Sequence, residues 1–320
     1  MVFPINVTHH PKFHDFATVR LDDHATVFSR SHRNSSFTPG TAILVWVLLL
    51  FIVSSHPAMA ATADPTWQVG GSLTHSSGDY GTGSTTTITY IPITIRRLFD
   101  SGDISLVIPY ISITGDCGVT LLSGTPNSTG GTCPTRTTTT TTGKGKGKEV
   151  TRTFQTRTTE GGIGDTILRG RYYVLEGSTT VPTVALIARV KVPTADSARG
   201  LGTGRFDETF GTELTQRLPS DFLAFADAGY TLIGHVPGAG LRNQWYYDLG
   251  LGYYVTKTLL GSVYYEERRA VVQGLQNPQD LLFALNWTAT DALRFNTALQ
   301  FGLSDGAPDY GITFGASLRF

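Results

Sequence analysis

The stretch YGITFGASLRF, from Tyr310 to Phe320, closes the given sequence and decides the fold class. Large apolar side chains alternate along it with small or polar ones, and the apolar set is Tyr310, Ile312, Phe314, Leu318 and Phe320. Alternation with a period of two is typical of a β-strand that has one apolar face. The stretch therefore predicts an amphipathic strand that ends on an aromatic residue.

A final strand of this kind resembles the one by which the assembly machinery recognises bacterial outer-membrane barrels, so we interpret its apolar residues as an assembly signal. Composition agrees, because the 320 residues include 36 Gly and only 16 % charged residues. The mean hydropathy is −0.03. A barrel wall with apolar residues outside and polar residues inside is expected to have a mean hydropathy near zero. The formal net charge is zero, which gives no indication of a nucleic-acid partner.

One long apolar run, AILVWVLLLFIV at 42–53, is too short to span a membrane as a helix, which needs about 20 residues. Arg30 and Arg33 precede it and the small-x-small sequence Ala58-Met59-Ala60 follows it. Residues 30–60 therefore read as a signal peptide, with a buried core segment as the alternative. Residues 1–29 are a polar, histidine-containing leader that we interpret as an over-extended translation start, with a metal-binding arm as the alternative.

Two cysteines, Cys117 and Cys133, fall in a stretch of Gly, Ser, Thr and Pro that we do not expect in a core. In an oxidising compartment such a pair most simply forms one loop-closing disulfide. A metal site is the alternative, although Asp116 is the one hard ligand nearby. We expect no cofactor and no resident metal.

From Trp67 onward the pattern predicts one domain over residues 61–320, an all-β, transmembrane, antiparallel up-and-down barrel of about twelve strands. A soluble sandwich is the alternative, but strands there usually have about five or six residues. The predicted strands are Trp67–His75, Thr85–Arg96, Ile104–Thr114, Gly162–Leu175, Val181–Val192, Asp207–Arg217, Asp221–Leu232, Trp245–Val255, Leu259–Glu266, Gln279–Thr288, Asp291–Gly302 and Pro308–Phe320.

The connections after every second strand are short, whereas those between them are mostly longer and richer in Gly, Pro and Asn. Outer-membrane barrels have short periplasmic turns, long external loops and both termini in the periplasm. We therefore expect the protein in a Gram-negative outer membrane, in contact with lipid bilayer and lipopolysaccharide.

Charged side chains fall on one face of each strand, as in the alternation of Thr183, Arg189 and Lys191 against Val184, Leu186 and Val190. A charge on the lipid face would cost about 2–4 kcal/mol at the midplane, so the ionic face is expected to line the lumen. These residues would form either a salt-bridge network that stiffens the wall or a selective constriction. The lumen-lining candidates are Arg169, Arg171, Arg189, Lys191, Glu213, Arg217, Asp227, Asp248, Glu266, Asn286, Arg294 and Arg319.

The longest loop, 115–161, holds a run of threonines at 137–142 and then lysines that alternate with glycine. Such a composition is not expected to bury a core. We interpret the loop as an external, solvated insertion, with binding of anionic lipopolysaccharide or guidance of acidic solutes as the alternatives.

Two glycine-rich motifs, GGIGDT at 161–166 and VPTADSARGLGTGRFD at 192–207, carry a family resemblance. A strand opened by G-x-G-D, a partner strand that ends in Pro-Thr and then a Leu-Gly-Thr-Gly loop resemble the outer-membrane transporters of the phenol meta-degradation pathway family. The resemblance covers about 161–320 and departs from the family at Ala195, where glycine is usual. It implies an outer-membrane barrel and passage of aromatic or other hydrophobic compounds.

Three classes of function follow from these observations. The first is a channel or transporter that passes small solutes passively, and the second is a non-conducting barrel that anchors external loops. The third is a lipid hydrolase, for which His75 and Ser77 lie on one face of a strand but lack an acidic residue at an orienting spacing. We therefore expect no enzyme.

Overall fold

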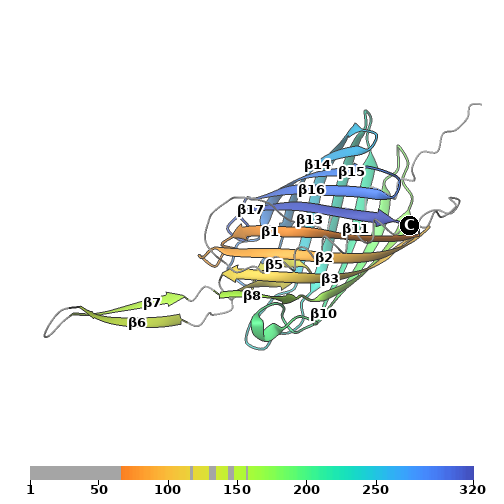
Figure 1. Cartoon of the computed structure of the whole chain (residues 1–320). Helices are drawn as coiled ribbons and strands as arrows, with labels where there is room; N and C mark the ends of the chain where they lie inside the picture. Colours follow the sequence, from red (N-terminus) through yellow and green to blue (C-terminus); the bar gives the residue numbers. More distant parts are fainter. Residues whose placement is uncertain (1–65, 116–117, 130–134, 143–147, 156–157) are drawn as a thin grey trace, which may run out of the picture. The chain divides into compact units, whose positions relative to one another are not determined.

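The computed structural model describes residues 66–115, 118–129, 135–142, 148–155 and 158–320, and these form an antiparallel β-barrel (Figure 1). Strands β1 to β3 and β8 to β17 form one sheet of 13 strands that closes on itself through the β2–β3 pairing. Strands β8 and β9 both pair with β3 and follow each other along it, so the wall is one of twelve strands. The predicted fold class is confirmed. The predicted leader, 1–29, and the predicted signal peptide, 30–60, lie outside the described residues, so both stay predictions.

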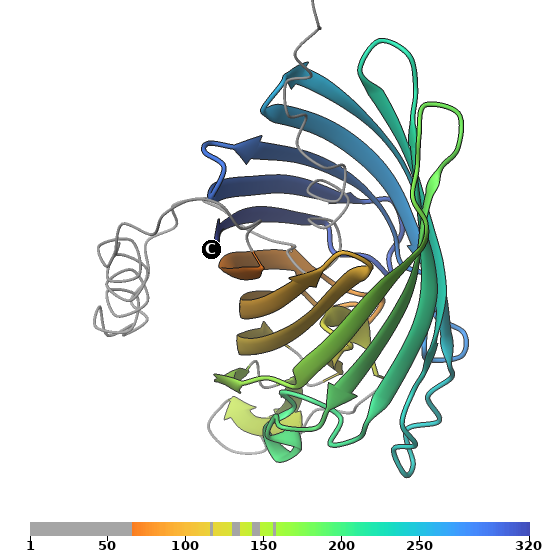
Figure 2. The same ribbon diagram turned by 90° about the vertical axis from the view of Figure 1, so that its right-hand side faces the viewer.

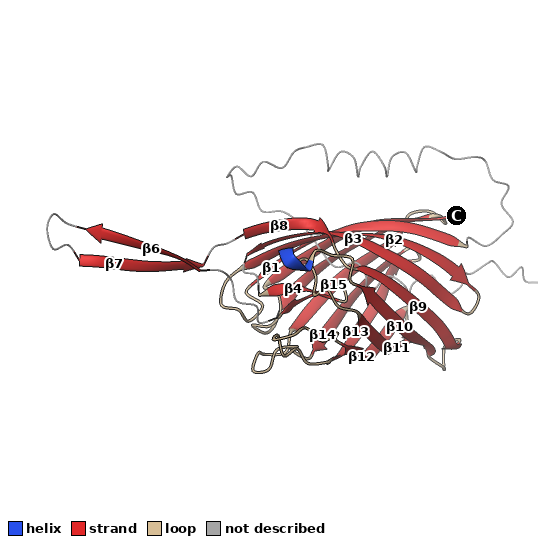
Figure 3. Ribbon diagram, turned by 90° about the horizontal axis from the view of Figure 1, so that it is seen from below, coloured by secondary structure: helices blue, strands red, loops and turns tan. Residues whose placement is uncertain are grey.

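The wall strands run almost as the alternation predicts, with small shifts at their ends. Only the 3-10 turn η2 (Ser197–Arg199) is helical among the described residues, and Figure 3 shows it as the one coloured helical segment. No helix in the described ranges is long and apolar enough to cross a membrane. The strands are β1 (Trp67–Gly78), β2 (Thr86–Phe99), β3 (Gly102–Gly115), β8 (Thr158–Ile163), β9 (Thr166–Leu175), β10 (Thr183–Val192), β11 (Asp207–Arg217), β12 (Phe222–Leu232), β13 (Gln244–Thr256), β14 (Leu259–Arg268), β15 (Gln279–Thr288), β16 (Leu293–Gly302) and β17 (Tyr310–Arg319).

The barrel closes between its first and last strands, which lie side by side in Figure 1. Strand β17 pairs with β1 from Ser77↔Tyr310 to Gln68↔Arg319. Beyond the last pair, Phe320 donates its backbone N–H to the Trp67 carbonyl at 3.0 Å and accepts from the Trp67 N–H at 3.0 Å. The final amphipathic strand thus has both of its edges paired, which closes the wall between β1 and β17.

Connections of two lengths separate the two ends of the barrel. The β2–β3, β9–β10, β11–β12, β13–β14 and β15–β16 links are short and lie at what we call the short-turn end, together with Trp67 and Phe320. The β8–β9 break lies beside the middle of β3, and the other links between wall strands lie at the opposite, long-loop end. This arrangement matches the parity predicted from the sequence.

The outer face of the wall is apolar around the barrel, whose curvature Figure 2 shows. Leucine, isoleucine and valine side chains along its middle are exposed, as at Leu186, Leu249 and Leu285. Aromatic residues are exposed toward both ends, for example Trp67 and Trp287 near the short turns and Phe210 and Tyr310 near the long loops. Such a surface requires lipid rather than water around it.

The region 115–161 differs from the loop predicted there. It contains two hairpins, β4 (Val119–Leu122) with β5 (Thr125–Ser128) and β6 (Thr135–Thr142) with β7 (Lys148–Gln155), and β8 already belongs to the wall. The β4–β5 hairpin is buried, with Val119, Leu121 and Leu122 each at most 4 % exposed. The prediction rested on the composition of the whole loop, which is rich in Gly, Ser and Thr. The apolar segment was missed because it is too short to change that composition much.

Candidate functional site: the charged interior of the barrel

The predicted lumen-lining residues lie mostly on the buried face of the wall. Asn286 and Arg294 are half-buried, and Arg217 is exposed at the short-turn end of its strand. Whether these residues line the path of a solute stays a prediction. The buried ones are Arg169, Arg171, Arg189, Lys191, Glu213, Asp227, Asp248, Glu266 and Arg319.

One group of contacts, which we call the arginine cluster, joins strands β2, β3, β9 and β11. Arg169 lies 2.6 Å from Glu213 Oε1, and Arg171 lies 2.8 Å from Glu213 Oε2. Arg171 also reaches Asp103 at 3.3 Å, and Arg96 reaches the same carboxylate at 3.4 Å. All five side chains are buried, so each charge depends on its partners for stabilisation.

A row of carboxylates crosses the neighbouring strands. Direct cross-strand pairing places Glu213 beside Asp227, Asp227 beside Asp248, Asp248 beside Glu266 and Glu266 beside Asp280. All five side chains are buried. Glu213 lies toward the short-turn end of β11, whereas Asp280 lies at the long-loop end of β15, so this carboxylate row climbs obliquely along the wall.

The two groups divide the interior into halves of opposite charge. Strands β11 to β15 carry the carboxylate row. The two residues at its ends form ion pairs: Glu213 with the arginine cluster, and Asp280 with Arg268 at 2.9 Å. Strands β2, β9 and β10 carry an excess of cations, namely Arg96, Arg169, Arg171, Arg189 and Lys191. Like charges in direct register repel each other, so the carboxylate row depends on compensating contacts.

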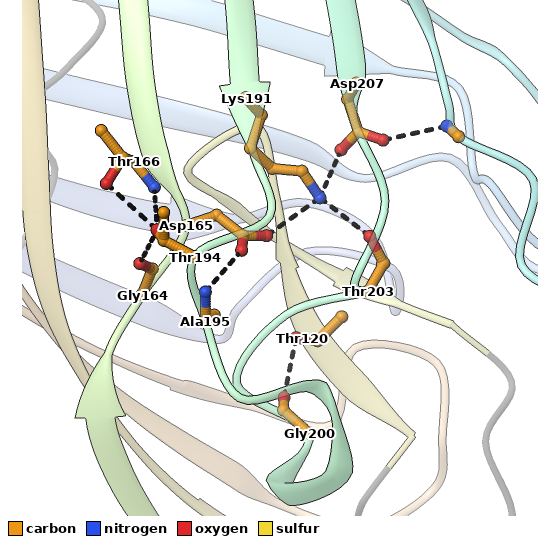
Figure 4. A network of polar contacts seen from close by, with 11 residues as sticks. Thr120, Gly164, Asp165, Thr166, Lys191, Thr194, Ala195, Gly200, Thr203 and Asp207 are labelled. Atoms are coloured by element: carbon orange, nitrogen blue, oxygen red, sulfur yellow. Dashed lines mark hydrogen bonds and ion pairs between the residues drawn. The ribbon is translucent and has the colours of Figure 1, made fainter.

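Near the long-loop end, Lys191 is held between two carboxylates, as Figure 4 shows. Its ammonium lies 3.0 Å from Asp165 Oδ2 and 2.8 Å from Asp207 Oδ2, and it donates to Thr203 Oγ1 at 2.8 Å. Asp165 lies at the break between β8 and β9, and Thr203 lies in the loop after β10. The ammonium therefore ties that loop to the interrupted strand.

The glycine-rich motifs singled out in the sequence meet at this point. Thr194 Oγ1 donates to the Gly164 carbonyl at 2.9 Å and accepts from the Thr166 N–H at 2.8 Å. The Ala195 N–H donates to Asp165 Oδ1 at 3.0 Å (Figure 4). Because the backbone makes this last bond, alanine can stand where the family usually has glycine. Gly202 cannot be replaced as easily, since a Cβ there would lie 2.7 Å from Asp165 Oδ2.

The β4–β5 hairpin packs against the inner face of strands β2 and β3. Its Val119 and Leu121 belong to one buried apolar cluster with Tyr80, Ile88, Tyr90, Ile111, Ile113, Ala195 and Leu201. Thr120 donates to the Gly200 carbonyl at 2.8 Å, and Asn127 accepts from Gln244 of β13 at 2.9 Å. The hairpin therefore contacts strands far apart around the barrel and occupies part of the interior at the long-loop end.

A second apolar cluster lies on the buried face of β12, β14, β15 and β16. It consists of Leu223, Phe225, Leu260, Tyr264, Leu282 and Ala298. Periodicity predicted the facing of these strands, but the cluster was missed because each strand contributes only one or two of its members.

The residues considered for hydrolysis make other contacts. His75 Nδ1 lies 3.3 Å from Thr89 Oγ1, and Ser77 Oγ lies 3.3 Å from Thr87 Oγ1. Within the described ranges, no three His, Cys, Asp or Glu residues gather to hold a metal ion. Cys117 and Cys133 lie outside the described residues, so their disulfide stays a prediction.

Comparison with protein families gives one match. The model of the family described as "Putative MetA-pathway of phenol degradation" matches residues 119–320, well over half of the chain. The chain belongs to this family. The match begins within β4, so it includes the buried hairpin as well as the motifs around Lys191. A search of curated proteins found no match.

Solved structures of outer-membrane barrels are similar in fold. An outer-membrane channel of Pseudomonas putida F1 is 13 % identical, with 83 % of this chain and 100 % of that chain covered and a TM-score of 0.52. The P. putida toluene transporter TodX is 8 % identical, with 81 % of this chain and 91 % of that chain covered and a TM-score of 0.38. The transport unit of the Escherichia coli autotransporter AIDA-I is 10 % identical, with 86 % of this chain and 97 % of that chain covered and a TM-score of 0.45. We base the likeness in fold on the first of these alone.

Proposed function

We propose that this protein is a passive outer-membrane channel for small solutes, with its short-turn end and both termini in the periplasm. The observation that carries the proposal is the charged interior of a barrel whose outside is apolar. A charge on the lipid face would cost about 2–4 kcal/mol at the midplane, so charged side chains gathered on the inner wall are better accounted for by a polar interior than by an apolar one. Opposite charges on facing halves of a narrow passage would bias which solutes enter.

Aromatic or other hydrophobic compounds are the solute class that we propose. The family description supports it, since it refers to phenol degradation. The apolar cluster of Leu223, Phe225 and Tyr264 gives a hydrophobic strip on the same interior wall as the carboxylate row. A solute with a ring and a polar group could contact both.

The test is conductance of the refolded protein in a planar bilayer, together with swelling of liposomes in small sugars and in phenol. Discrete conductance steps and swelling are expected, whereas a folded barrel that shows neither would refute the channel.

Orientation is tested in intact cells by thiol labelling with an impermeant reagent, on a background in which both native cysteines are replaced by serine. Gly238→Cys at the long-loop end should react and Thr179→Cys at the short-turn end should not.

A sealed barrel that anchors external loops is the second candidate, and the buried β4–β5 hairpin favours it. Replacing residues 118–129 by a short glycine-serine linker distinguishes the two. If the hairpin only narrows a channel, conductance should rise from a measurable starting value. If the intact protein conducts nothing and the shortened one conducts freely, the barrel is sealed in its resting form.

A further inference from the structure

Arg189 is a buried cation that makes no direct ion pair with a carboxylate in the described part of the chain. It lies on the buried face of β10 and is only 9 % exposed. No ion pair or hydrogen bond joins it to any described residue, and its Nε is buried without a hydrogen-bond partner. Its guanidinium carbon lies 6.0 Å from the centroid of the Tyr246 ring. A buried guanidinium in this state is costly unless something else neutralises it.

The carboxylates on the adjacent strand are already in use. Glu213 accepts from Arg169 and Arg171 through Oε1 and also lies 2.8 Å from Arg171 through Oε2. Asp207 pairs with Lys191 at 2.8 Å through Oδ2 and accepts from the Gly234 N–H through Oδ1. Across the strand on either side, Arg189 faces Arg169 and Thr209, neither of which is an anion.

Two glycines let Tyr246 reach this arginine from three strands away. Gly211 on β11 and Gly229 on β12 are neighbours of each other, and Gly229 is the cross-strand neighbour of Tyr246. A Cβ on either glycine would lie 2.5 Å from the Tyr246 hydroxyl oxygen. The tyrosine therefore lies flat over both and brings its ring to the guanidinium. An unpartnered cation and an aromatic surface are thus placed side by side inside the barrel.

We propose that Arg189 and Tyr246 form a binding site for small aromatic carboxylates. The guanidinium would hold the carboxylate through two parallel hydrogen bonds, and the ring of the solute would lie beside Tyr246. This site deepens the proposed channel function by naming a solute class, since a solute would reach it through the barrel. A cation beside an aromatic ring suits an aromatic solute with one negative group better than it suits a hydrocarbon without charge.

Benzoate is the probe, with acetate as the matched anion that lacks a ring. Binding to the refolded barrel in deuterated detergent is followed by saturation-transfer NMR, and folding of each variant is verified by its heat-modifiable migration on a gel. Arg189→Gln should weaken benzoate binding about tenfold or more, because a charge-assisted pair is lost. Tyr246→Leu should weaken benzoate binding and leave acetate binding unchanged. Arg205→Gln, an exposed arginine in the loop after β10, is the control and should change neither.

Unchanged benzoate binding in a folded Arg189→Gln variant would overturn the site, and equal affinity for acetate and benzoate would overturn the solute class. If the glutamine variant does not fold, Arg189→Lys keeps the positive charge but removes the two-bond geometry, and it should still bind benzoate more weakly than the wild type. Conductance is measured on the same preparations. Binding without conductance would refute the channel alone, whereas conductance without binding would refute this site alone.

Discussion

Replacing Lys191 by methionine is expected to destabilise the barrel more than the loss of one surface charge would. The lysine side chain is 1 % exposed and similar in length to that of methionine. The change therefore removes the ammonium group but alters the side-chain volume little. Asp165 Oδ2 and Asp207 Oδ2 have no hydrogen-bond partner, so each depends on this ammonium for its charge. The variant leaves two buried carboxylates without a counter-ion.

Breaking a buried ion pair by removal of one partner costs about 3–5 kcal/mol. At about 2–4 °C for each kcal/mol, the melting temperature should fall by about 6–20 °C. The assay is the temperature at which the refolded protein in detergent loses its heat-modifiable band. Limited proteolysis should also cut the loop 193–206 sooner, because Thr203 loses its donor and Asp165 its cation.

The control is the triple variant Lys191→Met, Asp165→Asn and Asp207→Asn. Asparagine keeps the oxygens that accept from the Ala195 and Gly234 N–H groups, and it removes the two uncompensated charges. The triple variant should recover at least half of the lost melting temperature. If it melts as low as the single variant, the cost comes from lost packing around the lysine stem, and the reasoning from buried charge is wrong.

Three further predictions concern assembly, selectivity and the two cysteines. Deleting Phe320 should remove the last backbone bonds between β17 and β1, those to Trp67, so membrane fractionation should find less folded protein; normal amounts of folded protein in the outer membrane would contradict this. Asp248→Asn combined with Glu266→Gln should shift the reversal potential toward anion selectivity by reducing the carboxylate row, and an unchanged potential would show that ions do not pass along that wall. Cys117 and Cys133 should resist thiol labelling until a reductant is added, and labelling of both in the untreated protein would exclude the disulfide.

The barrel could be predicted because its signals are local. Alternation along each strand determines which side chains face lipid, and a strand of about ten residues has enough positions for the period to be read. The ends of strands were less accurate, as at β1, which continues to Gly78 rather than ending at His75. There the polar residues Ser76 and Ser77 pair within the wall, and no change of period marks the point where the lipid-facing part ends.

The interior contacts could not be predicted in the same way, because they depend on register. Alternation predicts that Asp227, Asp248 and Glu266 share a face, but only the pairing of the strands shows that they are direct neighbours. Likewise, Arg189 and Lys191 looked equivalent two positions apart on one strand. Register gives Lys191 two carboxylates and leaves Arg189 with an aromatic ring.

The glycine content gains a specific meaning from these contacts. Glycine in a strand provides no side chain to pack and loses more backbone entropy on folding than other residues. Many glycines would therefore weaken the wall unless they allowed other stabilising contacts. On the inner face several of them lie under a large side chain of a neighbouring strand: Gly229 under Tyr246, Gly250 under Tyr264 and Gly315 under Asn296. A side chain that lies flat against the wall takes less of the cross-section than one that projects from it. Alanine at Gly229 should therefore push Tyr246 toward the middle of the barrel, which would separate it from Arg189 and narrow the passage at once.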